Sequence, residues 1–221
     1  MPTILRPRRP RSPCYHLDDV ACLLIAVACC GCSNRPAAIA QVEVDPVAVA
    51  SSLLESYDGD GDDALSADET QGFGCVEKYF GSYDVNNDGR LDREELSGRI
   101  GDVVFNPHKR FMSGECVVKR KGRPLTNATV HLKPLACLSG VIPPAAGVTN
   151  PAGFARLRLD EKDLPAGAPP FPGLVRPGLY RVEVTHASIP VPARFNSQSV
   201  LTAEISSASL NEGPILVDLD F

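Results

Sequence analysis

The acidic half of the chain is organised around one stretch, Asp84-Val-Asn-Asn-Asp-Gly-Arg-Leu-Asp-Arg-Glu-Glu95. Side chains that carry oxygen stand at its first, third, fifth, ninth and twelfth positions, which are Asp84, Asn86, Asp88, Asp92 and Glu95. Gly89 stands sixth, where a tight loop turns through a positive φ that glycine adopts without strain. A loop of this length can surround a hard cation with side-chain and backbone oxygens.

Calcium is the cation that this spacing favours, because it takes about six to eight oxygen ligands in a flexible arrangement. The seventh residue, Arg90, would contribute its backbone carbonyl, Asp92 a bridging water and Glu95 both carboxylate oxygens. The stretch resembles the EF-hand calcium loop at every motif position. The alternative interpretation is an acidic turn that is simply solvated.

A second copy of the pattern precedes the first. It offers the ligand set Asp58, Asp60, Asp62, Ala64 (through its carbonyl), Ser66 and Glu69. Leu65 matches Leu91 at the eighth position, where paired loops of this family bridge through a short strand. Asp63 stands sixth instead of glycine, and a positive φ there carries some strain. We therefore expect a distorted or weaker first loop.

Apolar residues at helical spacing flank the two loops. The expected stripes are Val47, Ala50, Leu53, Leu54 and Tyr57 before the first loop, Phe73, Val76, Phe80 and Tyr83 between the loops, and Leu96, Ile100 and Val103 after the second. Pro46 suits the start of the first helix. Asp58 and Asp84 are 26 residues apart, closer than in calmodulin-like pairs, so one short helix must serve both loops.

Charge is divided unevenly along the 221 residues, whose net charge is −5. Residues 43–95 hold 15 acidic and 3 basic side chains, whereas residues 96–221 hold 10 acidic and 14 basic ones. Tryptophan is absent and aromatic residues make up 6% of the chain, so the basic surplus lacks the aromatic side chains of a nucleic-acid platform. We therefore expect no nucleic-acid partner.

Residues 1–32 are typical of an export signal, and residues 33–46 of a tether. Arginines precede an apolar run at residues 20–30, which is shorter than the roughly 20 residues of a membrane span. The cysteines that follow resemble a bacterial lipoprotein cleavage site, with Cys32 or else Cys30 as the lipidated residue; a plain secretory signal is the alternative. Only Cys75, Cys116 and Cys137 follow, so at most one internal disulfide can form.

Alternating apolar residues and Gly- or Pro-containing turns replace the helical pattern in residues 112–221. The expected strands lie at residues 115–119, 128–132, 147–149, 154–159, 178–184, 200–205 and 215–219. Seven short strands with such turns predict an antiparallel β-sandwich. The whole chain is then a two-domain α + β protein, with an EF-hand pair at residues 47–105 and the sandwich at residues 112–221.

Several phrases of the second half resemble carboxypeptidase regulatory-domain-like modules, which have a transthyretin-like fold. They are Gly122-Arg-Pro-Leu125, Gly147-Val-Thr-Asn-Pro-Ala-Gly-Phe154, Pro177-Gly-Leu-Tyr-Arg-Val-Glu-Val184 and Pro192-Ala-Arg-Phe-Asn196. The resemblance implies a noncatalytic module. No serine stands in a Gly-x-Ser-x-Gly context and no histidines share metal-ligand spacing, so we expect no enzyme and no catalytic residues.

These patterns together predict an exported calcium-binding protein, lipid-anchored at the cell surface or in the periplasm, with the sandwich as a spacer or adhesion module. Two alternatives stay open: an accessory module that presents a peptide or glycan to a separate enzyme, and a hydrolase of a type without a familiar motif. Because the calcium loops belong to the first domain, the sequence predicts that a chelator leaves the melting temperature of the sandwich unchanged.

Overall fold

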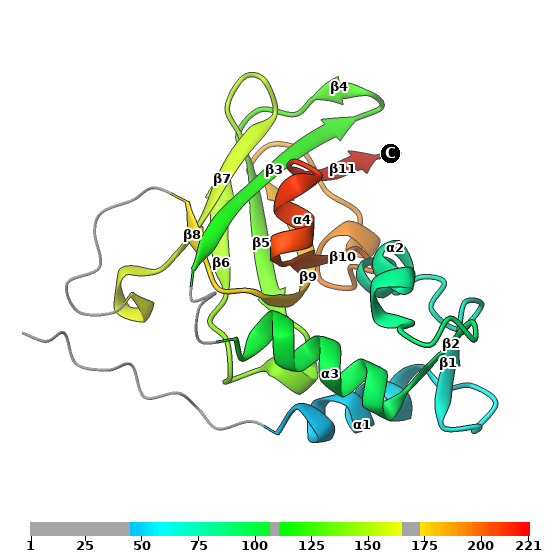
Figure 1. Ribbon diagram of the computed structural model, residues 1–221. Helices are drawn as coiled ribbons and strands as arrows, with labels where there is room; N and C mark the ends of the chain where they lie inside the picture. The colour runs from blue at the N-terminus through cyan, green and yellow to red at the C-terminus, as the bar shows by residue number, and fades with distance from the viewer. Residues whose placement is uncertain (1–44, 107–110, 165–172) are drawn as a thin grey trace, which may run out of the picture. The chain divides into compact units, whose positions relative to one another are not determined.

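A computed structural model describes residues 45–106, 111–164 and 173–221, with helices in the first part and strands in the rest (Figure 1). The expected signal, lipidation cysteines and most of the tether lie outside the described residues. Among those that are described, no helix combines the length and the apolar character that crossing a bilayer requires.

The acidic segment forms three helices and two short strands. Their bounds are α1 Pro46–Tyr57, β1 Ala64–Ser66, α2 Gly74–Tyr83, β2 Arg90–Asp92 and α3 Arg93–Val104. Asp45 caps α1 by accepting a hydrogen bond from the backbone N–H of Val47 at 2.9 Å, and Pro46 opens the helix as expected. Asp92 and Glu95 form a capping box at the start of α3.

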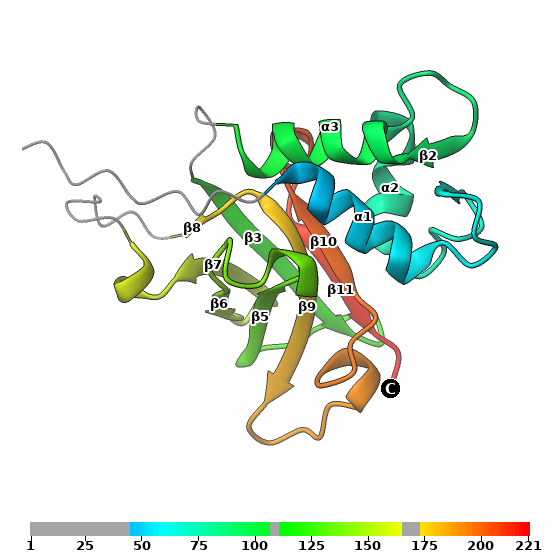
Figure 2. The same cartoon turned by 90° about the horizontal axis from the view of Figure 1, so that it is seen from below.

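The apolar stripes face one core, with one correction. The stripe of α3 is buried as predicted, and Phe73, Val76 and Tyr83 are buried between the loops. In α1, however, Val47 is 46% exposed and Val49 is buried, so the first turn is rotated from the predicted face. The helix is capped at Asp45, and α1 lies side by side with α3 (Figures 1 and 2), so this packing selects Val49.

The remainder of the described chain forms a nine-stranded sheet, in the order β10-β9-β5-β6-β7-β3-β11, with β4 and β8 also pairing with β3. The strands are β3 Met112–Arg120, β4 Arg123–Pro124, β5 Ala128–Pro134, β6 Ala145–Val148, β7 Phe154–Leu159, β8 Leu174–Val175, β9 Gly178–His186, β10 Thr202–Ile205 and β11 Ile215–Leu219. A short helix, α4 Ser207–Asn211, joins β10 to β11.

Two features of this sheet correct the sequence prediction. The seven expected strands are present, but the two-residue strands β4 and β8 add to them. The sheet is also not wholly antiparallel, because β11 runs parallel to β3, with Val217 opposite Val118. The chain reaches this pairing through α4, which reverses the direction after β10, and such a long-range choice of partner leaves no local signal in the sequence.

The helices and the sheet belong to one compact unit within Pro36–Phe221, and their buried apolar residues form one continuous cluster. Helix α2 lies against β10, and α3 lies against β9. Leu54 and Tyr83 of the helical part are therefore members of the same cluster as Leu132 and Val184 of the sheet. This shared core fixes where the two acidic loops stand relative to the sheet.

Candidate metal centre

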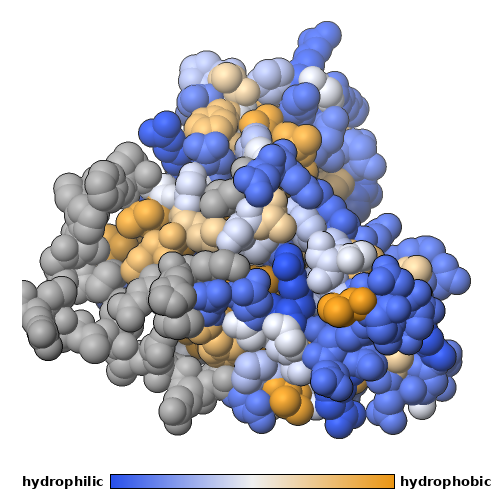
Figure 3. Space-filling view, in the orientation of Figure 1, coloured by the Kyte–Doolittle hydropathy of each residue, from blue (hydrophilic) through white to orange (hydrophobic). Residues whose placement is uncertain are grey.

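The two acidic loops occupy the ends of the helices, as the sequence predicts. The first loop (residues 58–69) begins at the C-cap of α1, and the second loop (residues 84–95) begins at the C-cap of α2. Between them, the chain forms turns at residues 67–72 and then the single helix α2. The prediction that one short helix serves both loops is confirmed. The surface in the region of the loops is mostly hydrophilic (Figure 3).

The first residue of each loop uses its carboxylate in the same way. Oδ2 of Asp58 accepts a hydrogen bond from the backbone N–H of Asp63 at 2.9 Å, and Oδ2 of Asp84 accepts one from Gly89 at 3.0 Å. Each bond joins the first position of a loop to its sixth. The other oxygen of Asp58 accepts from Gly61 at 2.7 Å. Both loops therefore wrap around the carboxylate that opens them.

The side chains of the third and fifth residues accept the same pair of backbone hydrogen bonds in both loops. Asp60 and Asn86, the third residues, each accept from the N–H two positions ahead, at 3.2 Å and 2.8 Å. Asp62 and Asp88, the fifth residues, each accept from the seventh residue, at 3.1 Å and 2.9 Å. Side-chain oxygens at alternate positions thus point toward the inside of the turn, where a cation would need them.

The twelfth residue closes each loop. Oε1 of Glu69 accepts from the N–H groups of Gly59 and Asp60 at 2.7 and 3.3 Å, and its Oε2 accepts from Ser66 at 2.8 Å. In the second loop, the carboxylate of Glu95 accepts from the equivalent three N–H groups. These donors are Val85 at 2.9 Å, Asn86 at 3.2 Å and Asp92 at 3.2 Å. Both glutamates therefore fold back over the start of their own loop.

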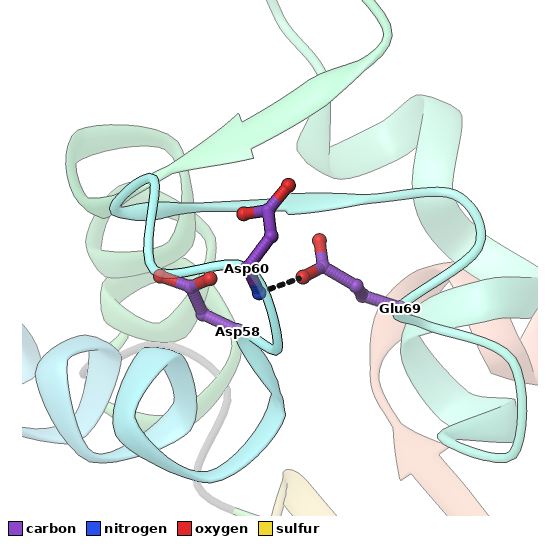
Figure 4. A group of neighbouring side chains, drawn as sticks. All are labelled: Asp58, Asp60 and Glu69. Carbon is purple, nitrogen blue, oxygen red and sulfur yellow. Dashed lines mark hydrogen bonds between the residues drawn. The ribbon is translucent and has the colours of Figure 1, made fainter.

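Three carboxylates of the first loop come together most closely. Asp58, Asp60 and Glu69 each offer one oxygen within 4.8 Å of the others. Figure 4 shows these three side chains on the first loop. Among the described residues, the acidic side chains of the second loop do not come as close together, and the third residue of that loop is Asn86. Asp62 is not part of the trio, and its carboxylate forms an ion pair with Arg90.

The two loops are joined back to back by β1 and β2. Leu65 pairs with Leu91, and on either side Ala64 pairs with Asp92 and Ser66 with Arg90. The eighth residues therefore face each other, with the seventh of one loop opposite the ninth of the other. Both leucines are fully buried, so the bridge is part of the core. The predicted match of Leu65 and Leu91 is confirmed.

Backbone torsions repeat between the loops as well. The sixth residues, Asp63 and Gly89, have φ of 64° and 82°, which confirms the prediction of a left-handed turn at both. The fourth residues, Gly61 and Asn87, also have positive φ, at 76° and 59°. The hydrogen bonds of the first loop match those of the second, so its backbone is not distorted, whereas weaker binding at the first loop stays a prediction. Asp63 adopts the glycine conformation and bears its strain.

Hydrogen bonds favour the charged form of Glu69. They lower its pKa from 4.5 to about 2, first through the N–H of Ser66, then through the Ser66 hydroxyl and the N–H of Gly59. Asp62 and Asp63 are balanced from the second loop, by Arg90 and by Arg93 at 3.5 Å respectively. The first loop thus has one glutamate whose charged form is stabilised by hydrogen bonds and two aspartates that pair with arginines of the second loop.

Three residues around the second loop carry contacts that the sequence reasoning missed. Tyr83 and Arg99, on either side of the loop, both bind the carboxylate of Glu204 in β10. Glu204 lies between apolar residues in a strand, where alternation predicts a solvated side chain. Its 3% exposure follows from the helices that cover this strand, so only the tertiary structure could identify it.

The cysteines of the described chain form no second centre. Cys75, Cys116 and Cys137 are free thiols, so the one disulfide that the sequence permits does not form among them. Burial raises the pKa of Cys75 and of Cys116 to about 12. Both thiols stay protonated at neutral pH, which disfavours metal binding and nucleophilic attack.

No protein-family model, curated protein or solved structure matches this chain. The geometry of the two loops therefore carries the functional argument.

Proposed function

We propose that this protein binds calcium through an EF-hand pair, with residues 58–69 and 84–95 as its two loops. The observation that carries the proposal is the repetition of one hydrogen-bond pattern in both loops, at the same positions. Backbone N–H groups of the second, third, sixth and ninth positions point at the carboxylates of the first and twelfth. A solvated acidic turn has no physical reason to repeat such a pattern twice.

The donor set suits calcium. The proposed ligands are Asp58, Asp60, Asp62, the carbonyl of Ala64, Ser66 and Glu69 in the first loop, and Asp84, Asn86, Asp88, the carbonyl of Arg90, Asp92 and Glu95 in the second. All of these donors are oxygens, which hard cations prefer to nitrogen or sulfur. The residues hold the ion and supply negative charge; the ion would neutralise their mutual repulsion.

We further propose an extracytoplasmic role, in which calcium stiffens the helical part between a lipid anchor and a noncatalytic β-sandwich that acts as a spacer or adhesion module. The support is the export-like leader at residues 1–32. Calcium outside the cytoplasm is abundant enough to fill sites of modest affinity. Mass spectrometry of the mature N-terminus tests the anchor: acyl chains on Cys32 or Cys30 support it, and an unmodified N-terminus rules it out.

Calorimetric titration of the full chain with calcium is the decisive test of metal binding. We expect two sites in the wild type and one in each of the variants Glu69→Gln and Glu95→Gln, because each loses the charge of a bidentate ligand. Glu94→Gln is the matched control, since Glu94 is exposed and adjacent to Glu95 but outside the ligand set. A wild type that releases no heat with calcium, but stays folded, would overturn the proposal.

A further inference from the structure

A carboxylate is buried in the middle of β10, beside the calcium-loop helices. Glu204 is 3% exposed, and its neighbours Ala203 and Ile205 are also buried. Strand β10 is an edge of the sheet and pairs only with β9 among the described strands, while α2 lies against it (Figure 1). A buried charge is costly unless it is paired, so its partners matter.

The partners of Glu204 stand on either side of the second loop. The hydroxyl of Tyr83 donates to Oε2 at 3.0 Å, and Nη2 of Arg99 contacts Oε1 at 2.5 Å. Tyr83 directly precedes Asp84, the first ligand position, and Arg99 lies one helical turn after Glu95, the last. One carboxylate of the sheet therefore connects the residues that enter and leave the loop.

Three hydrogen bonds attach helix α2 to β10 and to the residue after α4. The backbone N–H of Cys75 donates to Oγ1 of Thr202 at 2.9 Å, and the hydroxyl of Tyr79 donates to a carboxylate oxygen of Glu212 at 3.1 Å. The third is the bond from the Tyr83 hydroxyl to Glu204, so the contacts extend from the first residue pair of α2 to its last residue. The direction in which α2 enters the second loop is thus fixed by β10 and by the residue after α4.

Calcium binding requires the two ends of a loop to stay together. Here the carboxylate of Glu95 folds over the start of the loop, at 2.9 Å from the N–H of Val85, while Glu204 holds the flanking residues. Interactions that hold a binding site in its closed form reduce the conformational cost of binding. The contacts of Glu204 belong to that closed form.

We propose that Glu204 is a positioning residue for calcium binding at the second loop, acting through Tyr83 and Arg99. The inference rests on the proposed function, since it requires that the loop binds calcium. Coupling between two sites is reciprocal in free energy, so calcium in the second loop in turn stabilises the attachment of β10. The sheet is then part of the calcium site, although it supplies no ligand.

The test compares two buried glutamates on neighbouring strands. Glu183 in β9 is also 3% exposed, and it pairs with Lys133 at 2.6 Å and Arg181 at 3.0 Å, both within the sheet. Glu204→Gln and Glu183→Gln are made in the full chain that already carries Glu69→Gln, so that only the second loop titrates. In calorimetry with calcium chloride, Glu204→Gln should raise the dissociation constant of the second loop about 5-fold or more, whereas Glu183→Gln should not.

A loop-specific comparison separates positioning from general stability. In the full chain that carries Glu95→Gln instead, only the first loop titrates. Glu204→Gln should leave the affinity of that loop within about 2-fold of the parent, because Glu204 contacts Tyr83 and Arg99, which flank the second loop, and shares no partner with the first. Tyr83→Phe keeps the buried ring and removes only the hydroxyl. It should weaken the second loop by about 2-fold or more, even if Glu204→Gln fails to fold.

The results separate failure of the positioning role of Glu204 from failure of calcium binding itself. If the wild-type chain binds no calcium, the proposed function fails and the inference fails with it. If the wild type binds calcium but Glu204→Gln and Tyr83→Phe match Glu183→Gln at the second loop, the inference alone is overturned. Equal weakening of both loops by Glu204→Gln also overturns it, because that result indicates general destabilisation. Selective weakening of the second loop supports it.

Discussion

Asp63 and Arg90 are the residues that set the two loops apart. Asp63 takes at the sixth position the left-handed conformation that Gly89 takes in the second loop, whereas Asn87 takes at the fourth position the one that Gly61 takes in the first. Each loop therefore holds one non-glycine residue in this conformation, at a different position. Arg90 offers its carbonyl to the second loop, but its side chain forms an ion pair with Asp62, a proposed ligand of the first. A positive side chain of the second loop therefore offsets the negative charge of a carboxylate in the first.

Arg90→Gln should tighten calcium binding at the first loop, because it removes a cation that competes for Asp62. Both side chains are partly exposed, so the effect should be modest, at about 2- to 5-fold. The measurement is calorimetry on the full chain with Glu95→Gln as background. Arg123→Gln, which removes an exposed charge from the turn around β4, is the control. Weaker binding would instead mean that Arg90 holds Asp62 in its ligating position.

Glu69 should make the calcium-free protein sensitive to acid. Its pKa is lowered from 4.5 to about 2 in the folded state, so folding favours the ionised form. The stabilisation is present above pH 4.5 and is lost as the pH falls toward 2. Urea unfolding in the presence of a chelator should show a smaller loss across this window for Glu69→Gln than for the wild type or for Glu94→Gln. If the unfolding free energy of all three proteins fell equally with pH, the hydrogen bonds to Glu69 would not be the cause of the acid sensitivity.

The elements combine the loops into a pair. Strands β1 and β2 align the eighth residues opposite each other, and α1 packs beside α3. The short helix α2 lies between the turns that follow the first loop and the start of the second loop.

Leu91→Ala should weaken both calcium sites, since the buried Leu65–Leu91 contact is shared by both loops. Removing a buried leucine side chain costs about 2–5 kcal/mol of unfolding free energy. Val85→Ala is the matched control, because Val85 lies in the second loop but is 76% exposed. Denaturant unfolding and calcium titration of the full chain measure the two effects. Loss of affinity at the second loop alone would show that the bridge does not couple the pair.

One apolar core and the side chain of Glu204 join the two acidic loops to the sheet. This arrangement changes the expectation that the sequence supports, in which the sheet melts independently of calcium. Since the buried residues of the helices and of the sheet form one continuous cluster, we expect the two parts to unfold together.

Removal of calcium should therefore lower a single melting transition of the full chain. Calcium at ten times its dissociation constant adds roughly 1.4 kcal/mol for each site, and two sites together shift the melting temperature by several degrees. Amide hydrogen exchange in β5 and β9 would measure directly whether calcium changes the stability of the sheet. The Glu69→Gln/Glu95→Gln double variant should melt at the same temperature with or without chelator. Two melting transitions, of which only the first responds to calcium, would instead show that the sheet unfolds independently of the loops.

Features that depend on local chemistry can be predicted from the amino-acid sequence. They include both loops, the start of α1 at Pro46 and the bounds of β7 and β11, which follow from spacing, turn residues and capping groups close in the chain. Three other features appear only once the chain is folded: the parallel pairing of β11 with β3, the burial of Val49 in place of Val47, and the attachment of Glu204 to the residues that flank the second loop. These depend on which distant surface covers a residue, and that choice is made by packing across the whole core.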